Sequence, residues 1–71
     1  MTPAQCRAAR ALLGWTQGDL AYWAGVAIST VADFERGART PMSNNMGAMV
    51  MVLESAGLRF EQGGVVLEKL P

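Results

Sequence analysis

The positions of the glycines limit what this chain can fold into, because four of them follow stretches with a helical pattern of apolar residues. A glycine directly after such a stretch is a common helix stop, since it adopts the left-handed conformation at little cost. These glycines are Gly14, Gly25, Gly37 and Gly57. The helices that they end are predicted over residues 3–13, 17–24, 28–36 and 44–56. A chain of 71 residues forms one small domain, so we expect a mainly α domain of four short helices over residues 1–57.

The first two predicted helices begin with recognisable capping residues. Thr2 with Gln5, and Thr16 with Asp19, have the spacing of a capping box, in which two side chains satisfy backbone N–H groups that the helix itself leaves free. The third helix is preceded by Ala27, where Ser or Thr would be expected. The missing cap costs this helix about 1 kcal/mol.

The tail predicts a C-terminal β-hairpin over residues 58–71, which either packs on the helical domain or serves in dimerisation. Residues 63–64 are both glycine and suit a two-residue type I′ turn. The cross-strand neighbours expected from this turn are Phe60 with Leu67 on one face and, as an ion pair, Arg59 with Glu68 on the other. Lys69 lies on the same tail.

The composition argues against several classes of function. Six basic residues balance six acidic ones and there is no histidine, whereas dedicated nucleic-acid-binding proteins usually carry a basic excess. Cys6 is the only cysteine, so the chain builds neither a disulfide framework nor a zinc site, and a reducing compartment is indicated. No long apolar run and no signal-peptide pattern is present. We therefore expect a cytoplasmic protein without a membrane segment, cofactor, metal or enzymatic activity.

The order helix, glycine turn, helix, glycine stop is that of a helix-turn-helix unit. Over about residues 5–56 the chain, with the segment LLGWTQGDLAYWAGVAISTVADFERGARTP, resembles the phage-repressor-like (Cro/repressor, xenobiotic-response-element type) helix-turn-helix family. The resemblance implies a partly buried ion pair between Arg10 and Glu35 that ties the first helix to the third. The matching residues are Leu13, Gly14, Thr16, Gln17, Leu20, Ala21, Gly25, Val26, Thr30, Val31, Phe34, Glu35 and Gly37.

The resemblance also implies a DNA-contacting surface, with residue 17 on a phosphate and residues 27, 28, 29, 32 and 33 toward the major groove. Base edges are recognised through hydrogen bonds, but three of these five positions hold alanine or isoleucine, which have no side-chain donor or acceptor. The residues that would bind DNA are Gln17, Ala27, Ile28, Ser29, Asp33, Arg36 and Arg39.

The apolar residues at these groove positions, together with apolar residues on the second and fourth helices, are typical of a surface that binds another protein. Tyr22 and Trp23 are adjacent on a helix, so at most one of them points into the core, and we expect at least one exposed aromatic. The helix over 44–56, with Ser43 as its expected cap, has two apolar stripes, and one domain this small covers only one of them. The predicted partner-binding residues are Tyr22, Trp23, Ala27, Ile28, Ala32, Met51 and Val52.

Two functions follow from these patterns. The first is a small bacterial transcription-regulatory protein that binds a protein partner, such as a transcription factor, as an antiactivator or antirepressor. It would act through apolar surfaces on the helices over 17–24, 28–36 and 44–56. The alternative is a sequence-specific DNA-binding repressor that acts as a dimer.

Overall fold

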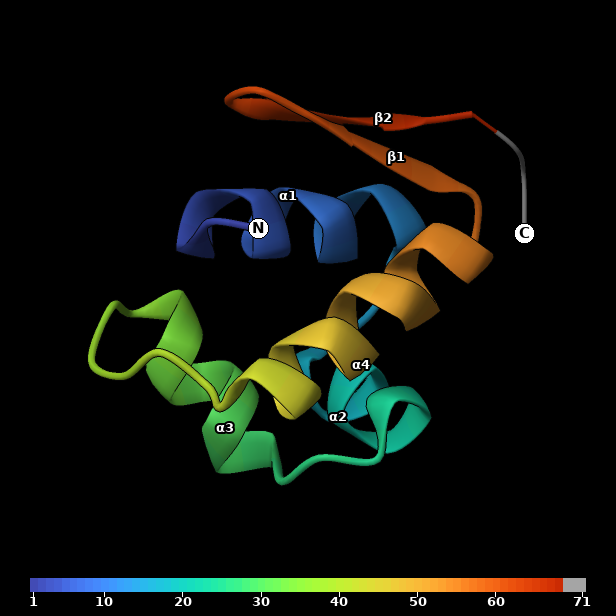
Figure 1. Cartoon of the computed structure of the whole chain (residues 1–71). Helices are drawn as coiled ribbons and strands as arrows, with labels where there is room; N and C mark the ends of the chain where they lie inside the picture. The colour runs from blue at the N-terminus through green and yellow to red at the C-terminus, as the bar shows by residue number, and fades with distance from the viewer. Residues whose placement is uncertain (69–71) are drawn as a thin grey trace.

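The computed structural model describes residues 1–68, in which four helices are followed by an antiparallel hairpin (Figure 1). The elements are α1 (Pro3–Leu13), α2 (Gln17–Ala24), α3 (Ile28–Glu35), α4 (Ser43–Ser55), β1 (Leu58–Glu61) and β2 (Gly64–Leu67). This is the mainly α architecture that the sequence predicts. No helix in the described part of the chain is long and apolar enough to span a membrane.

Both predicted capping boxes are present. The Thr2 hydroxyl accepts from the Gln5 N–H and the Gln5 side chain accepts from the Thr2 N–H, at 3.1 and 2.9 Å. Thr16 and Asp19 form the same two bonds at the start of α2, at 2.9 and 3.0 Å. Ala27 precedes α3 without any side-chain cap, as expected.

The cap predicted for the fourth helix was wrong. α4 begins one residue early, so Ser43 is already in its first turn and Met42, which has no acceptor for the free N–H groups, occupies the cap position. Both α3 and α4 therefore begin without a side-chain cap.

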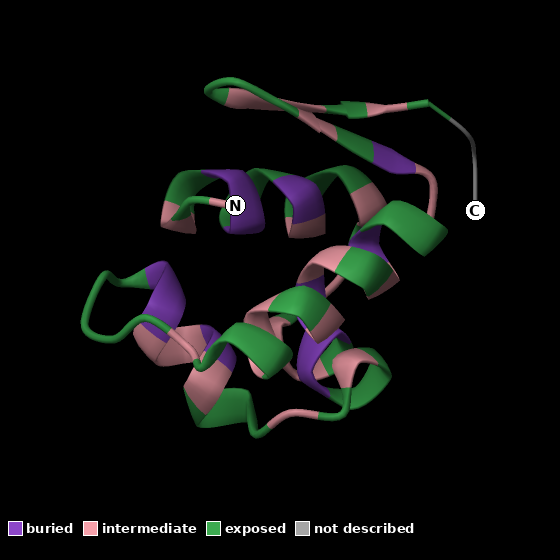
Figure 2. Cartoon of the chain, viewed as in Figure 1, coloured by how far each residue is buried: buried purple, intermediate pink, exposed green. Residues whose placement is uncertain are grey.

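The core lies where α2 packs on α3 and α4, and where α1 packs on α3 (Figure 2). The buried apolar residues are Cys6, Ala9, Leu20, Ala21, Val31, Phe34, Met49, Leu53 and Leu58. They come from all four helices and from β1, so the helices and the hairpin share one core.

The hairpin has a different register from the predicted one. Phe60 pairs with Val65 and Leu58 with Leu67, so the loop consists of residues 62–63 and the type I′ turn at 63–64 was wrong. A type I′ turn needs two central residues with positive φ, and here Gly63 has one whereas Gly64 does not. The observed register gives two apolar cross-strand pairs on one face, Leu58 with Leu67 and Phe60 with Val65. The predicted register gives only one such pair, Phe60 with Leu67.

The predicted face of each hairpin residue is nevertheless correct, because the register differs by two residues and only a shift of one exchanges the faces. The predicted ion pair is also present, now on a diagonal, with Arg59 Nε 3.1 Å from Glu68 Oε2. Lys69 lies outside the described residues.

The hairpin packs on the helical domain, with β2 against α1 and β1 against α4. In Figure 1 it lies across α1 as a separate layer. The Gln5 side chain joins the hairpin to α1, because its Nε2 donates hydrogen bonds to the backbone oxygens of Glu61 and Gly64 at 2.6 and 2.9 Å. One residue therefore caps α1 and holds the turn of the hairpin.

Candidate functional site

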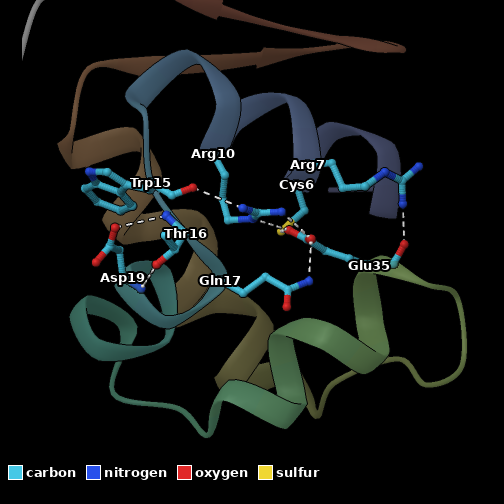
Figure 3. Close-up of polar contacts among 8 residues, drawn as sticks. All are labelled: Cys6, Arg7, Arg10, Trp15, Thr16, Gln17, Asp19 and Glu35. Atoms are coloured by element: carbon cyan, nitrogen blue, oxygen red, sulfur yellow. Dashed lines mark hydrogen bonds and ion pairs between the residues drawn. The ribbon is translucent and has the colours of Figure 1, made fainter.

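The first three helices are held together by a carboxylate at the end of α3. Glu35 is buried, and Arg10 of α1 binds it with two hydrogen bonds, from Nε to Oε2 and from Nη2 to Oε1, each 2.7 Å long (Figure 3). Gln17 of α2 donates to Oε1 at 3.0 Å, and the Cys6 thiol donates to Oε2 at 3.1 Å. Arg7 donates to the backbone oxygen of Glu35. The carboxylate thus joins the first three helices.

The same contacts set the ionisation of the group. Burial alone would raise the pKa of the Glu35 carboxyl, but hydrogen bonds from Arg10, Gln17 and Cys6, with the charge of Arg10, hold it below its ordinary value. Burial, together with the neighbouring carboxylate, raises the pKa of the Cys6 thiol to about 12. Glu35 is therefore ionised and Cys6 protonated at neutral pH.

Gln17, the residue expected on a DNA phosphate, directs its amide inward to Glu35 in this structure. The side chain is half-buried at the start of α2 (Figure 3). A phosphate contact would require the amide N–H to leave Glu35 or to donate its second hydrogen outward.

The first turn of α3 faces outward (Figure 2) and is mainly apolar. Ala27, Ile28 and Ser29 are exposed, and the Ile28 side chain keeps 57% of its surface. One turn further, Ala32 and Asp33 are half-buried. The Asp33 carboxylate is paired with Arg36, so neither charge is free.

Both aromatic residues of α2 are exposed, Tyr22 at 76% and Trp23 at 61%. The sequence left open which of the two points outward, and both do, because Leu20, Ala21 and Ala24 supply the inner face of α2. The rings make an edge-to-face contact with centroids 5.1 Å apart.

Ile28 and the aromatics belong to one surface. The Ile28 Cδ1 lies 3.5 Å from where a Cβ on Gly18 would stand, so isoleucine covers the start of α2. Gly18 and Tyr22 are one turn apart on the same side of that helix. We call Gly18, Tyr22, Trp23, Ala27 and Ile28 the α2–α3 patch.

The two partner-binding residues predicted on α4 differ in exposure. Val52 packs against the core and only Met51 is strongly exposed, at 68%. Val52 therefore contributes to the fold, whereas Met51 adds exposed apolar surface to α4.

A shallow pocket of about 250 Å³ opens between α3 and the start of α4. Its lining residues are Ser29, Thr30, Asp33, Arg39, Thr40, Pro41, Met42 and Asn45. Ser29, Asp33 and Arg39 are among the residues predicted to bind DNA, but the sequence does not indicate that they lie beside the other lining residues. The 38–42 connection folds back beside α3, and no local pattern in the sequence signals that return.

The positive charges near this face are few. In the described chain, Arg10, Arg36 and Arg59 are paired with carboxylates, and Arg7 and Arg39 are not. Residues 1–68 also contain no group of three or more His, Cys, Asp or Glu side chains that could hold a metal ion. The site therefore consists of an apolar patch, a polar pocket and little net charge. Neither the comparison with protein-family models nor that with curated proteins found a match for this chain.

Proposed function

We propose that this protein is a transcription-regulatory protein of the phage-repressor-like helix-turn-helix type that acts by binding another protein. The partner is a regulatory protein such as a transcription factor, and binding makes this chain an antiactivator or antirepressor. The link to transcription comes from the sequence resemblance. The α2–α3 patch supports action through a protein partner.

The observation that carries the proposal is the exposure of Ile28, Tyr22 and Trp23, with Ile28 beside Gly18 of α2 and the two rings in contact. Isolated apolar residues are normal on a surface, but adjoining aromatic and aliphatic residues are enriched where proteins bind one another. Tyrosine and tryptophan in particular supply much of the binding energy at interfaces. The one charged side chain beside the patch on α2 is that of Asp19, which is engaged in the capping box with Thr16.

The electrostatics support the same conclusion. DNA affinity depends on arginines and lysines that neutralise phosphates, and the described chain offers Arg7 and Arg39 without a carboxylate partner. Arg36, at the end of α3, is engaged with Asp33. A protein partner needs no such charges.

A second candidate function is a dimeric, sequence-specific DNA-binding repressor. The observation that favours it is the placement of Ser29 and Arg39, which both line the pocket beside α3. A hydroxyl can hydrogen-bond a base edge and a guanidinium can hold a phosphate, so a dimer would have two such pairs.

A DNA titration separates the two functions. The isotope-labelled full chain is mixed with duplexes from upstream of its own gene at about 50 mM salt, where electrostatic binding is strong. We expect no saturable, sequence-dependent shift in the amide signals of residues 27–36. Such shifts would establish the DNA-binding alternative instead.

Substitution of the patch tests the protein-binding function directly. Ile28→Asp places a charge in the α2–α3 patch, and we expect it to keep the circular dichroism of the native fold while a transcription factor no longer co-purifies. Leu12→Asp is the matched control, because Leu12 is an exposed aliphatic residue on α1 and outside the patch. The interaction is then reconstituted from the purified pair. If Ile28→Asp binds as tightly as the native chain, the patch is not the interface.

A further inference from the structure

We infer that the pocket between α3 and α4 receives an acidic side chain of the partner protein, with Arg39 as its counter-ion. This inference rests on the proposed function and adds the chemistry of the partner: an acidic residue next to an apolar one. The α2–α3 patch takes the apolar residue and the pocket takes the carboxylate.

The pocket adjoins the patch through neighbouring residues of one helical turn. Ile28 belongs to the patch, and Ser29 and Thr30 line the pocket. A partner segment that covers Ile28 therefore reaches the pocket without crossing another element. The far wall is supplied by Thr40, Met42 and Asn45.

The charges of the pocket select an anion. Arg39 lines the pocket and is exposed. No carboxylate of residues 1–68 forms an ion pair with it. The carboxylate that also lines the pocket, Asp33, is already neutralised by Arg36. The local balance is thus one uncompensated positive charge.

The remaining groups fit a carboxylate better than a more highly charged ligand. A guanidinium offers two parallel N–H donors, which match the two oxygens of a carboxylate, and the hydroxyls of Ser29 and Thr40 can add further donors. Arg39 is the one arginine of the wall, so the pocket holds a single positive charge that matches a single carboxylate. Pro41 and Met42 add aliphatic and thioether surface to the wall, which suits the methylene groups of a glutamate.

Two capped peptides test this pairing without requiring the partner. Ala-Leu-Glu-Ala supplies the acidic residue next to an apolar one, and Ala-Leu-Gln-Ala is its neutral counterpart. In a titration of the labelled full chain, both are followed through the amides of Ser29, Thr30, Thr40 and Asn45. We expect the acidic peptide to bind about two- to five-fold more tightly than the neutral one, which is the usual size of an exposed ion pair.

Two variants assign the preference to one residue. Arg39→Gln is expected to abolish the difference between the peptides, whereas Arg59→Gln, which removes the same charge from the hairpin, keeps it. Equal binding of both peptides by the native chain, or a preference that survives Arg39→Gln, overturns the inference.

A random-sequence duplex is titrated in the same way. The duplex could shift the same amides more than the acidic peptide does, in a way that depends on Arg39. That result would assign the pocket to a phosphodiester and would also overturn the inference. The proposed function is judged separately by Ile28→Asp. If Ile28→Asp loses the transcription factor while the peptides are not distinguished, the proposed function stands and the pocket assignment falls.

Discussion

At the scale of single residues, Glu35 joins the first three helices through one carboxylate. Its carboxylate is buried and accepts hydrogen bonds from Arg10, Gln17 and Cys6. Arg10→Ala leaves this charge without its counter-ion, and we expect a loss of about 3–5 kcal/mol in the free energy of unfolding. Urea denaturation near neutral pH measures the loss. Arg36→Ala, which breaks an exposed ion pair, is the control and should cost less than about 0.5 kcal/mol.

The same carboxylate makes stability depend on pH. The pKa of Glu35 is lower in the folded chain than in the unfolded one, so its contribution is complete above the unfolded value of about 4.3 and is lost as the pH falls through the folded value. Glu35→Gln removes this titration. We therefore expect the stability difference between the native chain and Glu35→Gln to be constant from about pH 8 to pH 5 and to shrink below about pH 4. A difference that grows in acid would show that another group dominates.

At the scale of elements, the four helices were predictable because their signals are local. A capping box spans four residues, and a glycine stop needs only the residue itself, so α1 and α2 begin and end as expected. The hairpin register was not predictable from its glycine pair. The register is set by the pairing of Leu58 with Leu67 and by the hydrogen bonds from the Gln5 side chain to the turn. Those two hydrogen bonds connect residues that are separated by 56 and by 59 positions in the sequence, so no local pattern predicts them.

Glycines inside and after the helices test this local logic. Gly47 lies within α4 with nothing within 4 Å of an added Cβ, so Gly47→Ala should stabilise the fold by about 1 kcal/mol. Gly25, with φ of 70°, is the left-handed cap of α2, and Gly25→Ala should destabilise it by about 1–2 kcal/mol. Thermal unfolding of both variants measures the changes, each about 4–8 °C per kcal/mol in a domain of this size. A lower melting temperature for Gly47→Ala would show that α4 is strained at this point.

At the scale of the whole molecule, the sequence indicated which side chains could form an interface but not how they meet. Adjacent aromatics at 22 and 23 pointed to exposure, and both are exposed. The closeness of Ile28 to Gly18, and the pocket beside Arg39, depend on how α3 packs on α2 and on where the next loop returns. The side of α4 that carries Val52 was hard to assign for the same reason, since a helix with apolar residues on most sides does not reveal which side faces the core.

The free positive charges of residues 1–68 limit how steeply the affinity of this part of the chain for DNA can depend on salt. Each neutralised phosphate contributes about −0.9 to the slope of log K against log salt, so Arg7 and Arg39 together give a slope near −1.8 per chain, or roughly tenfold weaker binding from about 50 to 200 mM salt. Fluorescence anisotropy with a random duplex measures this slope. Arg7→Ala and Arg39→Ala should each remove about 0.9 from it, whereas Arg36→Ala should change it little because Asp33 already neutralises that arginine. A slope steeper than about −3 per chain would mean that the paired arginines exchange their carboxylates for phosphates, and the internal ion pairs would then not limit DNA binding.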